Sequence, residues 1–367
     1  MAKNIFTASI KKSVSKIGFE ELFKIFSELI LLTSGNVNEA LSWLSNLDRK
    51  YNLTSDEYGI GDFINDLKEK GFIEEKKGAE NSLSITPKSE HYLRKKALEE
   101  IFSKLKKSKK GNHSIAAYGK GYDIINDTKP FEFGDPYEDI CYTESLVNAQ
   151  INHGIQNFFI TEKDLQVFQK ESCFQTSTVL MIDISHSMVL YGEDRITPAK
   201  KTAMAFAELI KAKYPRDTLD IVVFGDDAWS IQIKDLPYLT VGPYYTNTVA
   251  GLERAIEILR RKKATNKQIF MITDGKPSCL KIGTNYYKNS FGLDKKIVGK
   301  TLALAHRCRR LGITITTYMV AKDPYLREFV REFTRANHGL AYFCDPNNVG
   351  SVLLEDYKRS KKKFFNH

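Results

Sequence analysis

Residues 178–188, which read TVLMIDISHSM, give the first indication of the fold. The apolar run at 179–182 contains no charged group and is too short for a buried helix, so it predicts a strand covered on both faces. Asp183 directly follows this strand, and Ser185 and Ser187 come shortly after it. The strand is therefore expected to end in a loop that is rich in oxygen-bearing side chains.

Four further short apolar runs follow the first one, at residues 219–224, 269–272, 313–320 and 340–343. Segments with apolar residues at helical spacing separate the runs, for example Ala203, Phe206, Ala207 and Ile210. Continuous apolar strands that alternate with helices predict an α/β fold with a doubly wound, mostly parallel sheet. In such a sheet, ligands bind outside the carboxyl ends of the strands.

Two more oxygen-bearing residues occupy comparable places in the predicted sheet. Thr246 lies just before a helical segment, and Asp274 follows the run at 269–272. Two carboxylates and three hydroxyls are hard oxygen ligands, which suit Mg2+ or Mn2+ better than zinc or copper. Because two carboxylates only neutralise a divalent ion, the metal remains able to accept an outside anion, such as a partner's Asp or Glu.

At these positions the sequence resembles the von Willebrand factor type A (vWA) domain. The metal-ion-dependent adhesion site (MIDAS) of that family consists of D-x-S-x-S, a Thr and an Asp. The resemblance covers residues 178–356, and the phrases MIDISHSM, TNTVAGLERA and MITDGKPS are similar to those of bacterial intracellular members. It implies a Rossmann-like fold and a metal site made of Asp183, Ser185, Ser187, Thr246 and Asp274. Many relatives carry a glycine-rich loop before the Thr, whereas this chain has GPYY at 242–245, so Thr248 is the alternative to Thr246.

The same residues favour a protein-binding module and not an enzyme, so no catalytic residue is assigned. His186 adjoins two serines, but no G-x-S-x-G motif is present, and Ser185 stands where an aspartyl phosphatase would need a second acid. The resemblance implies a partner of the AAA+ ATPase class, of the MoxR or metal-chelatase type, or a client of that ATPase. The sequence lacks a P-loop, so the ATPase would be a separate chain. An unrecognised hydrolase is the third interpretation.

Three parts are expected along the chain. Residues 1–105 form a helical, winged-helix-like domain, because helical stripes precede KGFIEEKKGAENSLSITPKSEHYL, which indicates a helix, a strand, a wing, a strand and a helix. Residues 106–172 form a lysine- and serine-rich linker and a bridging segment with a helix near 143–153. Residues 173–367 form the vWA domain with a basic tail.

The formal net charge of +10 over 367 residues suggests nucleic acid as a rival partner. Most of the excess lies at 94–110 and 355–363, so the alternative is a winged-helix DNA-binding regulator whose vWA domain binds a partner. A solvated lysine-rich surface is the preferred interpretation. No apolar segment is long enough to span a membrane, and residues 1–12 lack a secretory pattern, so a cytoplasmic protein is expected.

Overall fold

The computed structural model describes residues 18–55, 57–75, 82–108, 128–132, 137, 140–154, 159–168, 175–289, 291–321 and 323–363. Several features of the sequence lie outside these residues, namely the N-terminal 1–12, the predicted wing at 77–78, most of the predicted linker at 106–121 and the sequence Gly134-Asp135-Pro136, which predicts a turn. The described residues 18–108 and 175–361 form one compact unit, and those within 128–168 form a second.

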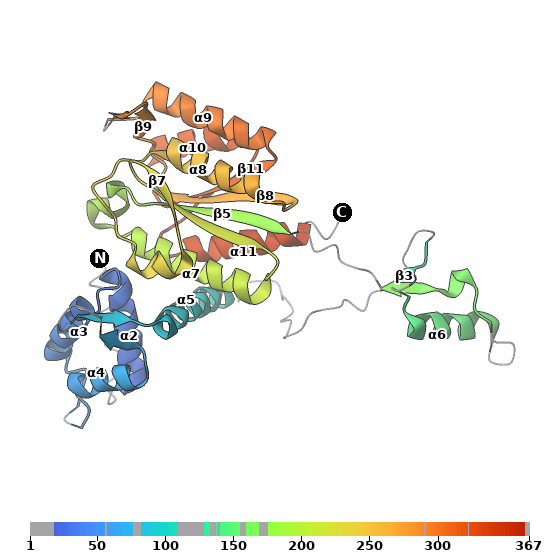
Figure 1. Ribbon diagram of the computed structural model, residues 1–367, viewed down its shortest axis with the longest axis horizontal. Coiled ribbons are helices and arrows are strands. Elements are labelled where there is room, and N and C mark those ends of the chain that lie inside the picture. The colour runs from blue at the N-terminus through green and yellow to red at the C-terminus, as the bar shows by residue number, and fades with distance from the viewer. Residues whose placement is uncertain are drawn as a thin grey trace. The chain divides into compact units, whose positions relative to one another are not determined.

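A six-stranded sheet organises the first unit (Figure 1). Its strand order is β12-β11-β8-β5-β6-β7, and every neighbouring pair is parallel except β6 with β7. The strands are β5 (Thr176–Asp183), β6 (Thr218–Phe224), β7 (Ala228–Ile231), β8 (Asn266–Thr273), β11 (Ile313–Met319) and β12 (Leu340–Phe343). The five predicted strands and the doubly wound α/β fold are confirmed, and the antiparallel edge strand β7 is an addition.

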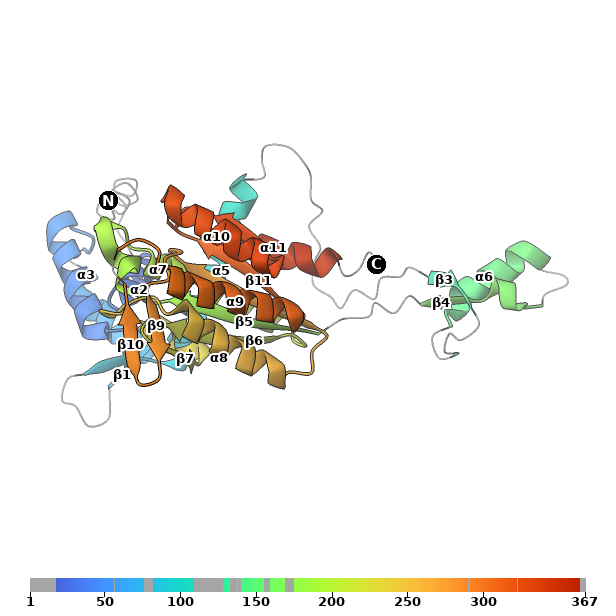
Figure 2. The same ribbon diagram turned by 90° about the horizontal axis from the view of Figure 1, so that it is seen from above.

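Helices cover both faces of this sheet (Figures 1 and 2). One face packs against α8 (Thr248–Arg261), α9 (Lys295–Arg310) and α10 (Pro324–Asn337), with Val179 and Met181 of β5 in that core. The other face packs against α7 (Ile196–Lys213) and α11 (Val349–Lys363), with Leu180 and Ile182 in its core. The continuous apolar run of β5 thus serves two cores, because alternate side chains point to opposite faces.

The N-terminal region comprises α2 (Phe19–Leu32), α3 (Val37–Tyr51), α4 (Ile60–Glu69), β1 (Ile73–Glu75), β2 (Leu83–Ile85) and α5 (Pro87–Ser108). The predicted helices and the antiparallel strand pair are confirmed, with Ile73 opposite Ile85. The sequence predicts Asp62 as the N-cap of α4, because it directly precedes the apolar Phe63 and Ile64, and this prediction is wrong. The N-cap is Gly59, and Asp62 lies one turn inside the helix, where its carboxylate accepts a hydrogen bond from the Gly59 N–H at 2.9 Å. The winged-helix assignment stays a prediction.

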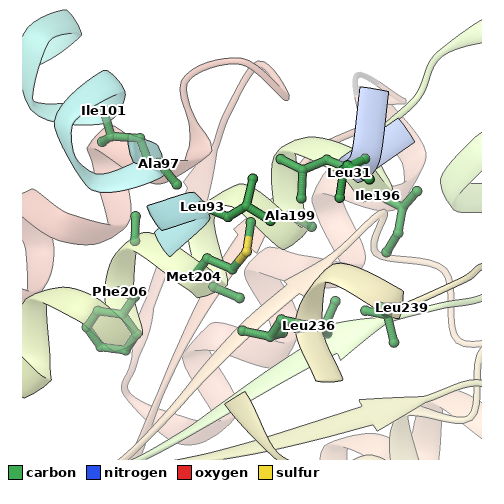
Figure 3. Packing of buried hydrophobic residues seen from close by; sticks show 14 of the residues in the cluster. Leu31, Leu93, Ala97, Ile101, Ile196, Ala199, Met204, Phe206, Leu236 and Leu239 are labelled. Carbon is green, nitrogen blue, oxygen red and sulfur yellow. The ribbon is translucent and has the colours of Figure 1, made fainter. Parts of the chain in front are cut away.

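The N-terminal helices share one apolar core with the α7 face of the sheet. Figure 3 shows Leu93 and Ala97 of α5 close to Met204 of α7, and these side chains are fully buried or nearly so. Thus α5 packs directly on α7. The boundaries expected at residues 105 and 172 stay predictions. The N-terminal helices and the α7 face of the sheet are not separated by a surface, because their buried side chains form one core.

The second unit is small and consists of β3 (Thr128–Pro130), α6 (Tyr142–His153), the short 3-10 helix η2 (Glu162–Asp164) and β4 (Gln166–Phe168). Strands β3 and β4 pair antiparallel, and α6 closely matches the helix predicted at 143–153. Asp164 stabilises the unit, because its carboxylate accepts hydrogen bonds from Thr161 and Asn152 and lies 3.0 Å from Nε2 of His153. No helix in the described part of the chain is long and apolar enough to cross a bilayer.

Candidate metal centre

The loop after β5 brings three of the predicted ligands together. Asp183 ends the strand, and its Oδ1 accepts a hydrogen bond from the Ser185 N–H at 2.9 Å. The hydroxyls of Ser185 and Ser187 lie 2.9 Å apart. Two backbone hydrogen bonds from neighbouring segments hold the loop, since Ile184 donates to Phe224 and His186 donates to Tyr244. The D-x-S-x-S motif therefore forms one compact turn of oxygen donors.

Asp274 joins this turn from the neighbouring strand. It directly follows β8, which pairs with β5, so the two strand ends lie side by side. Its carboxylate accepts a hydrogen bond from the Ser187 hydroxyl. Thr273 links the strands further, because its hydroxyl donates to Oδ2 of Asp183 at 2.7 Å and accepts from the Gly275 N–H at 3.1 Å. Gly275 has φ +92°, a conformation that favours glycine, so the chain can turn sharply there.

The electrostatics of this pair are unfavourable unless a cation is nearby. Burial, and after it the negative charge of Asp274, raise the pKa of Asp183 to about 7. Burial also raises the pKa of Asp274, although the hydrogen bond from Ser187 and the charge of Arg195 oppose that shift. In the described part of the chain neither carboxylate forms a salt bridge. A hard divalent cation fits this donor set, because it would compensate two buried negative charges at once.

Thr246 is buried beside the loop that follows Asp274. Its N–H donates to the hydroxyl of Ser278 at 3.0 Å, and its carbonyl accepts from the N–H groups of Ser278 and Cys279. Thr248 begins α8, and it lines a small internal cavity together with Phe329 and Val330 of α10. The contacts thus join four predicted ligands into one cluster, while Thr246 is held beside it through its backbone. Whether Thr246 or Thr248 supplies the fifth ligand stays a prediction.

Two features of the surroundings were absent from the sequence-based prediction. The guanidinium of Arg195 donates to the Ser187 carbonyl at 3.4 Å and pairs with Glu193 at 2.9 Å, so a positive charge lies against the serine turn. An antiparallel hairpin of β9 (Cys279–Ile282) and β10 (Asn285–Lys288) follows the Asp274 loop. The sequence K-I-G-T-N-Y at 281–286, with its glycine between β-branched and aromatic residues, is the signal that could have indicated it.

The sheet order, the helices on both faces and the serine turn at the end of β5 define a von Willebrand factor type A domain. Residues 176–358 match the family model described as "Rv0959-like protein, vWA domain", so the chain is a vWA-domain protein. Residues 124–170 match the model "Rv0959-like protein, third domain", which includes the described part of the second unit.

Parts of this chain are also similar to curated relatives and to solved structures. Uncharacterized protein Rv0959 of Mycobacterium tuberculosis and Mb0984 of Mycobacterium bovis are each 27% identical over 306 residues, which cover 81% of this chain and 44% of the relative. The chain therefore spans less than half the length of these relatives. The PilB minor pilin of Streptococcus sanguinis is 13% identical with a TM-score of 0.42, covering 57% of this chain and 66% of that one. The vWF domain of the Porphyromonas gingivalis type V pili tip protein Mfa5 is 14% identical with a TM-score of 0.42, covering 52% and 96%.

Proposed function

We propose that this chain is a non-enzymatic module that binds a partner protein through a divalent metal ion, Mg2+ or Mn2+. The observation that carries the proposal is the cluster in which Ser185 and Ser187 link the buried carboxylates of Asp183 and Asp274. Two negative charges balance a divalent cation and leave it electrophilic. An Asp or Glu of the partner would complete the coordination, so the affinity for the partner would depend on the metal.

The resemblance to bacterial intracellular vWA proteins supports one class of partner, an AAA+ ATPase of the MoxR or chelatase type or its client. On this proposal the chain is a cytoplasmic adaptor. The chain would supply the metal and its protein ligands, and the ATPase or client would supply the acidic residue. The carboxylate beside Ser187 is that of Asp274, and in this proposal its charge balances the metal ion and does not activate the hydroxyl, which favours binding over hydrolysis.

DNA binding is the less favoured alternative, for electrostatic reasons. Helix α4 and strand β1 carry the acidic side chains of Asp62, Glu69, Glu74 and Glu75 on their exposed sides. Phosphate groups would be repelled there. Arg94 and Lys96, at the start of the basic segment, are partly used inside the fold, since Arg94 lies 3.5 Å from Glu208 and Lys96 lies 3.7 Å from Glu28. These pairings leave fewer cations for a nucleic acid.

Metal binding is the first test. Titration of Mg2+ into the full chain should raise its free energy of unfolding by about 2.7 kcal/mol at a concentration of one hundred times Kd. Asp183→Asn keeps the shape and an acceptor for the Ser185 N–H but removes the charge, so its stability should not respond to Mg2+. Asp345→Asn is the matched control, because Asp345 follows the outer strand β12 of the same sheet and should leave the response intact.

Partner binding is the second test, with a purified MoxR-type AAA+ ATPase from the same organism as the probe. The complex should form in Mg2+, dissociate in EDTA and fail to form with Asp183→Asn. A complex that is equally stable in EDTA would refute metal-dependent binding. An Asp183→Asn protein that Mg2+ stabilises as much as the wild type would refute the metal site itself.

A further inference from the structure

The hairpin of β9 and β10 adjoins the candidate metal centre, and the proposed function gives the hairpin no role. Gly283, with φ +61°, lies in the turn between its strands. The hairpin stands between the Asp274 loop and α9, and Figure 2 shows it as a two-stranded ribbon beside α8 and α9. Among the described strands, β9 and β10 pair only with each other. The hairpin therefore adds nothing to the main sheet.

Hydrogen bonds fix the base of this hairpin to the candidate metal ligand Thr246. Ser278 both donates to the Thr246 carbonyl at 2.9 Å and accepts from the Thr246 N–H at 3.0 Å. Asn289, at the other end of the hairpin, donates its N–H to the Ser278 carbonyl at 2.8 Å. The base of the hairpin is therefore anchored to the backbone of Thr246.

Ion pairs fix one face of the hairpin to the loop after β6. Lys288 lies 2.7 Å from Asp226 and Lys281 lies 3.1 Å from Asp227, and the Tyr286 hydroxyl also donates to Asp227. These two lysines and two aspartates balance in charge. The positive charges of the two hairpin lysines are thus neutralised by the aspartates of the neighbouring loop.

The opposite face of the hairpin is apolar and exposed in part, because Leu280 is buried in the core while Ile282 and Tyr287 are exposed. Tyr287 lies opposite the buried Leu280 in the strand pair, so both side chains are on the same face, and Ile282 follows on that face. Ile282 is 44% exposed, Tyr287 is 40% exposed, and Phe291 just beyond the hairpin is 88% exposed. The Tyr287 hydroxyl donates to Asp294 at 2.9 Å, which restrains the ring. An exposed, restrained aromatic group can bind with little loss of conformational entropy.

We propose that Ile282, Tyr287 and Phe291, the hairpin patch, form the second contact for the partner and select its sequence. This inference rests on the proposed function. The fitting occupant is a protein segment in which apolar residues flank the Asp or Glu that binds the metal. Two observations favour this occupant. The metal centre calls for an anion while the patch side chains Ile282, Tyr287 and Phe291 are uncharged, and the hydrogen bonds between Ser278 and Thr246 join the base of the hairpin to the metal centre.

Synthetic peptides are the probe for this inference, with binding to the full chain followed by fluorescence anisotropy. One peptide carries a central Glu flanked by Leu and Phe, a second carries the same Glu flanked by Ser, and a third replaces the Glu by Gln. In Mg2+ the wild type should bind the apolar-flanked Glu peptide about tenfold more tightly than the Ser-flanked one, a difference of about 1.4 kcal/mol. The Gln peptide should not bind.

Substitutions locate the preference in the hairpin patch. Ile282→Ser and Phe291→Ser change exposed side chains and should abolish the tenfold preference while leaving the Mg2+-dependent binding of the Ser-flanked peptide. Leu311→Ser is the matched control, because Leu311 is similarly exposed, at 40%, but lies at the end of α9 that precedes β11. It should keep the preference.

The outcomes separate the two proposals. Mg2+-dependent binding without a flank preference, or with a preference that survives Phe291→Ser, overturns the role of the hairpin patch and leaves the metal-dependent function. Absence of Mg2+-dependent binding for every peptide overturns the proposed function and this inference together. If sedimentation shows a dimer that Phe291→Ser dissociates, the hairpin patch is an interface between two copies and the inference is also overturned.

Discussion

Lys200 provides a test of how the N-terminal helices are attached to the vWA domain. It lies in α7, is only 1% exposed, and its ammonium group donates hydrogen bonds to the carbonyls of Leu31 at 2.8 Å and Leu239 at 3.0 Å. Leu31 belongs to the last turn of α2, where the helix dipole favours a cation. Burial nevertheless lowers the pKa of Lys200 to about 8, with Asp194 opposing the shift.

The sign of the pH dependence follows from that pKa. Between pH 8 and 10.5 the unfolded chain keeps the proton on Lys200 while the folded chain loses it, so the unfolded state binds more protons and stability rises with pH. Between pH 7 and pH 10, a folded pKa of about 8 against the ordinary lysine pKa of 10.5 corresponds to a gain of about 2.5 kcal/mol in the free energy of unfolding.

Lys200→Met isolates this contribution, because methionine occupies similar space and does not titrate. Urea unfolding of both proteins at pH 7 and pH 10 gives four free energies, and other titrating groups cancel when the variant is subtracted from the wild type. The wild type should gain about 2.5 kcal/mol over the variant across this range. A difference that stays constant within about 0.5 kcal/mol would mean that Lys200 is solvated, and its hydrogen bond to the Leu31 carbonyl of α2 would be wrong.

Two further predictions concern other parts of the fold. A Cβ at Gly339 would collide with the carbonyl oxygen of Ile315 in β11, so Gly339→Ala should cost about 2 kcal/mol in urea unfolding, whereas Gly299→Ala in α9 meets open space and should stabilise by up to about 1 kcal/mol. Equal effects of both variants would contradict this. The hydrogen bonds of Thr161 and Asn152 hold the pKa of Asp164 well below its usual range, so this stabilisation is present near neutral pH and is lost on acidification. Asp164→Asn should therefore speed hydrogen exchange of the α6 amides at pH 7, and unchanged exchange would show that the carboxylate is dispensable.

Much of the sheet follows from the sequence because its central strands are buried on both faces. The runs at 179–182 and 269–272 lie within β5 and β8, and the run at 340–343 matches β12. The meeting of Asp183 and Asp274 is predictable for the same reason, since adjacent parallel strands end at the same edge. By contrast, β7 is short and only partly buried, so it has no apolar run to reveal it.

Lys200 shows what a sequence cannot reveal. It stands among Ala199, Lys201 and Thr202, and a lysine in an amphipathic helix is normally read as solvent-exposed. Its neighbour Lys201 does pair with carboxylates, at 2.6 Å from Glu28. Only the tertiary contact with α2 shows that Lys200 is enclosed. The exposed hairpin escaped prediction for the opposite reason, since all four residues of β10 are exposed and carry no burial pattern.

The core that α2 and α5 share with α7 bears on how the protein should be produced. A fragment trimmed to the family match at 176–358 would keep α7 but lose Leu93, Ala97 and Ile101, which cover it. The uncovered side of α7 would then be an exposed apolar surface that favours self-association. Apparent binding by such a fragment would report that surface and not the metal centre. Expression work on this chain should therefore begin upstream of α2.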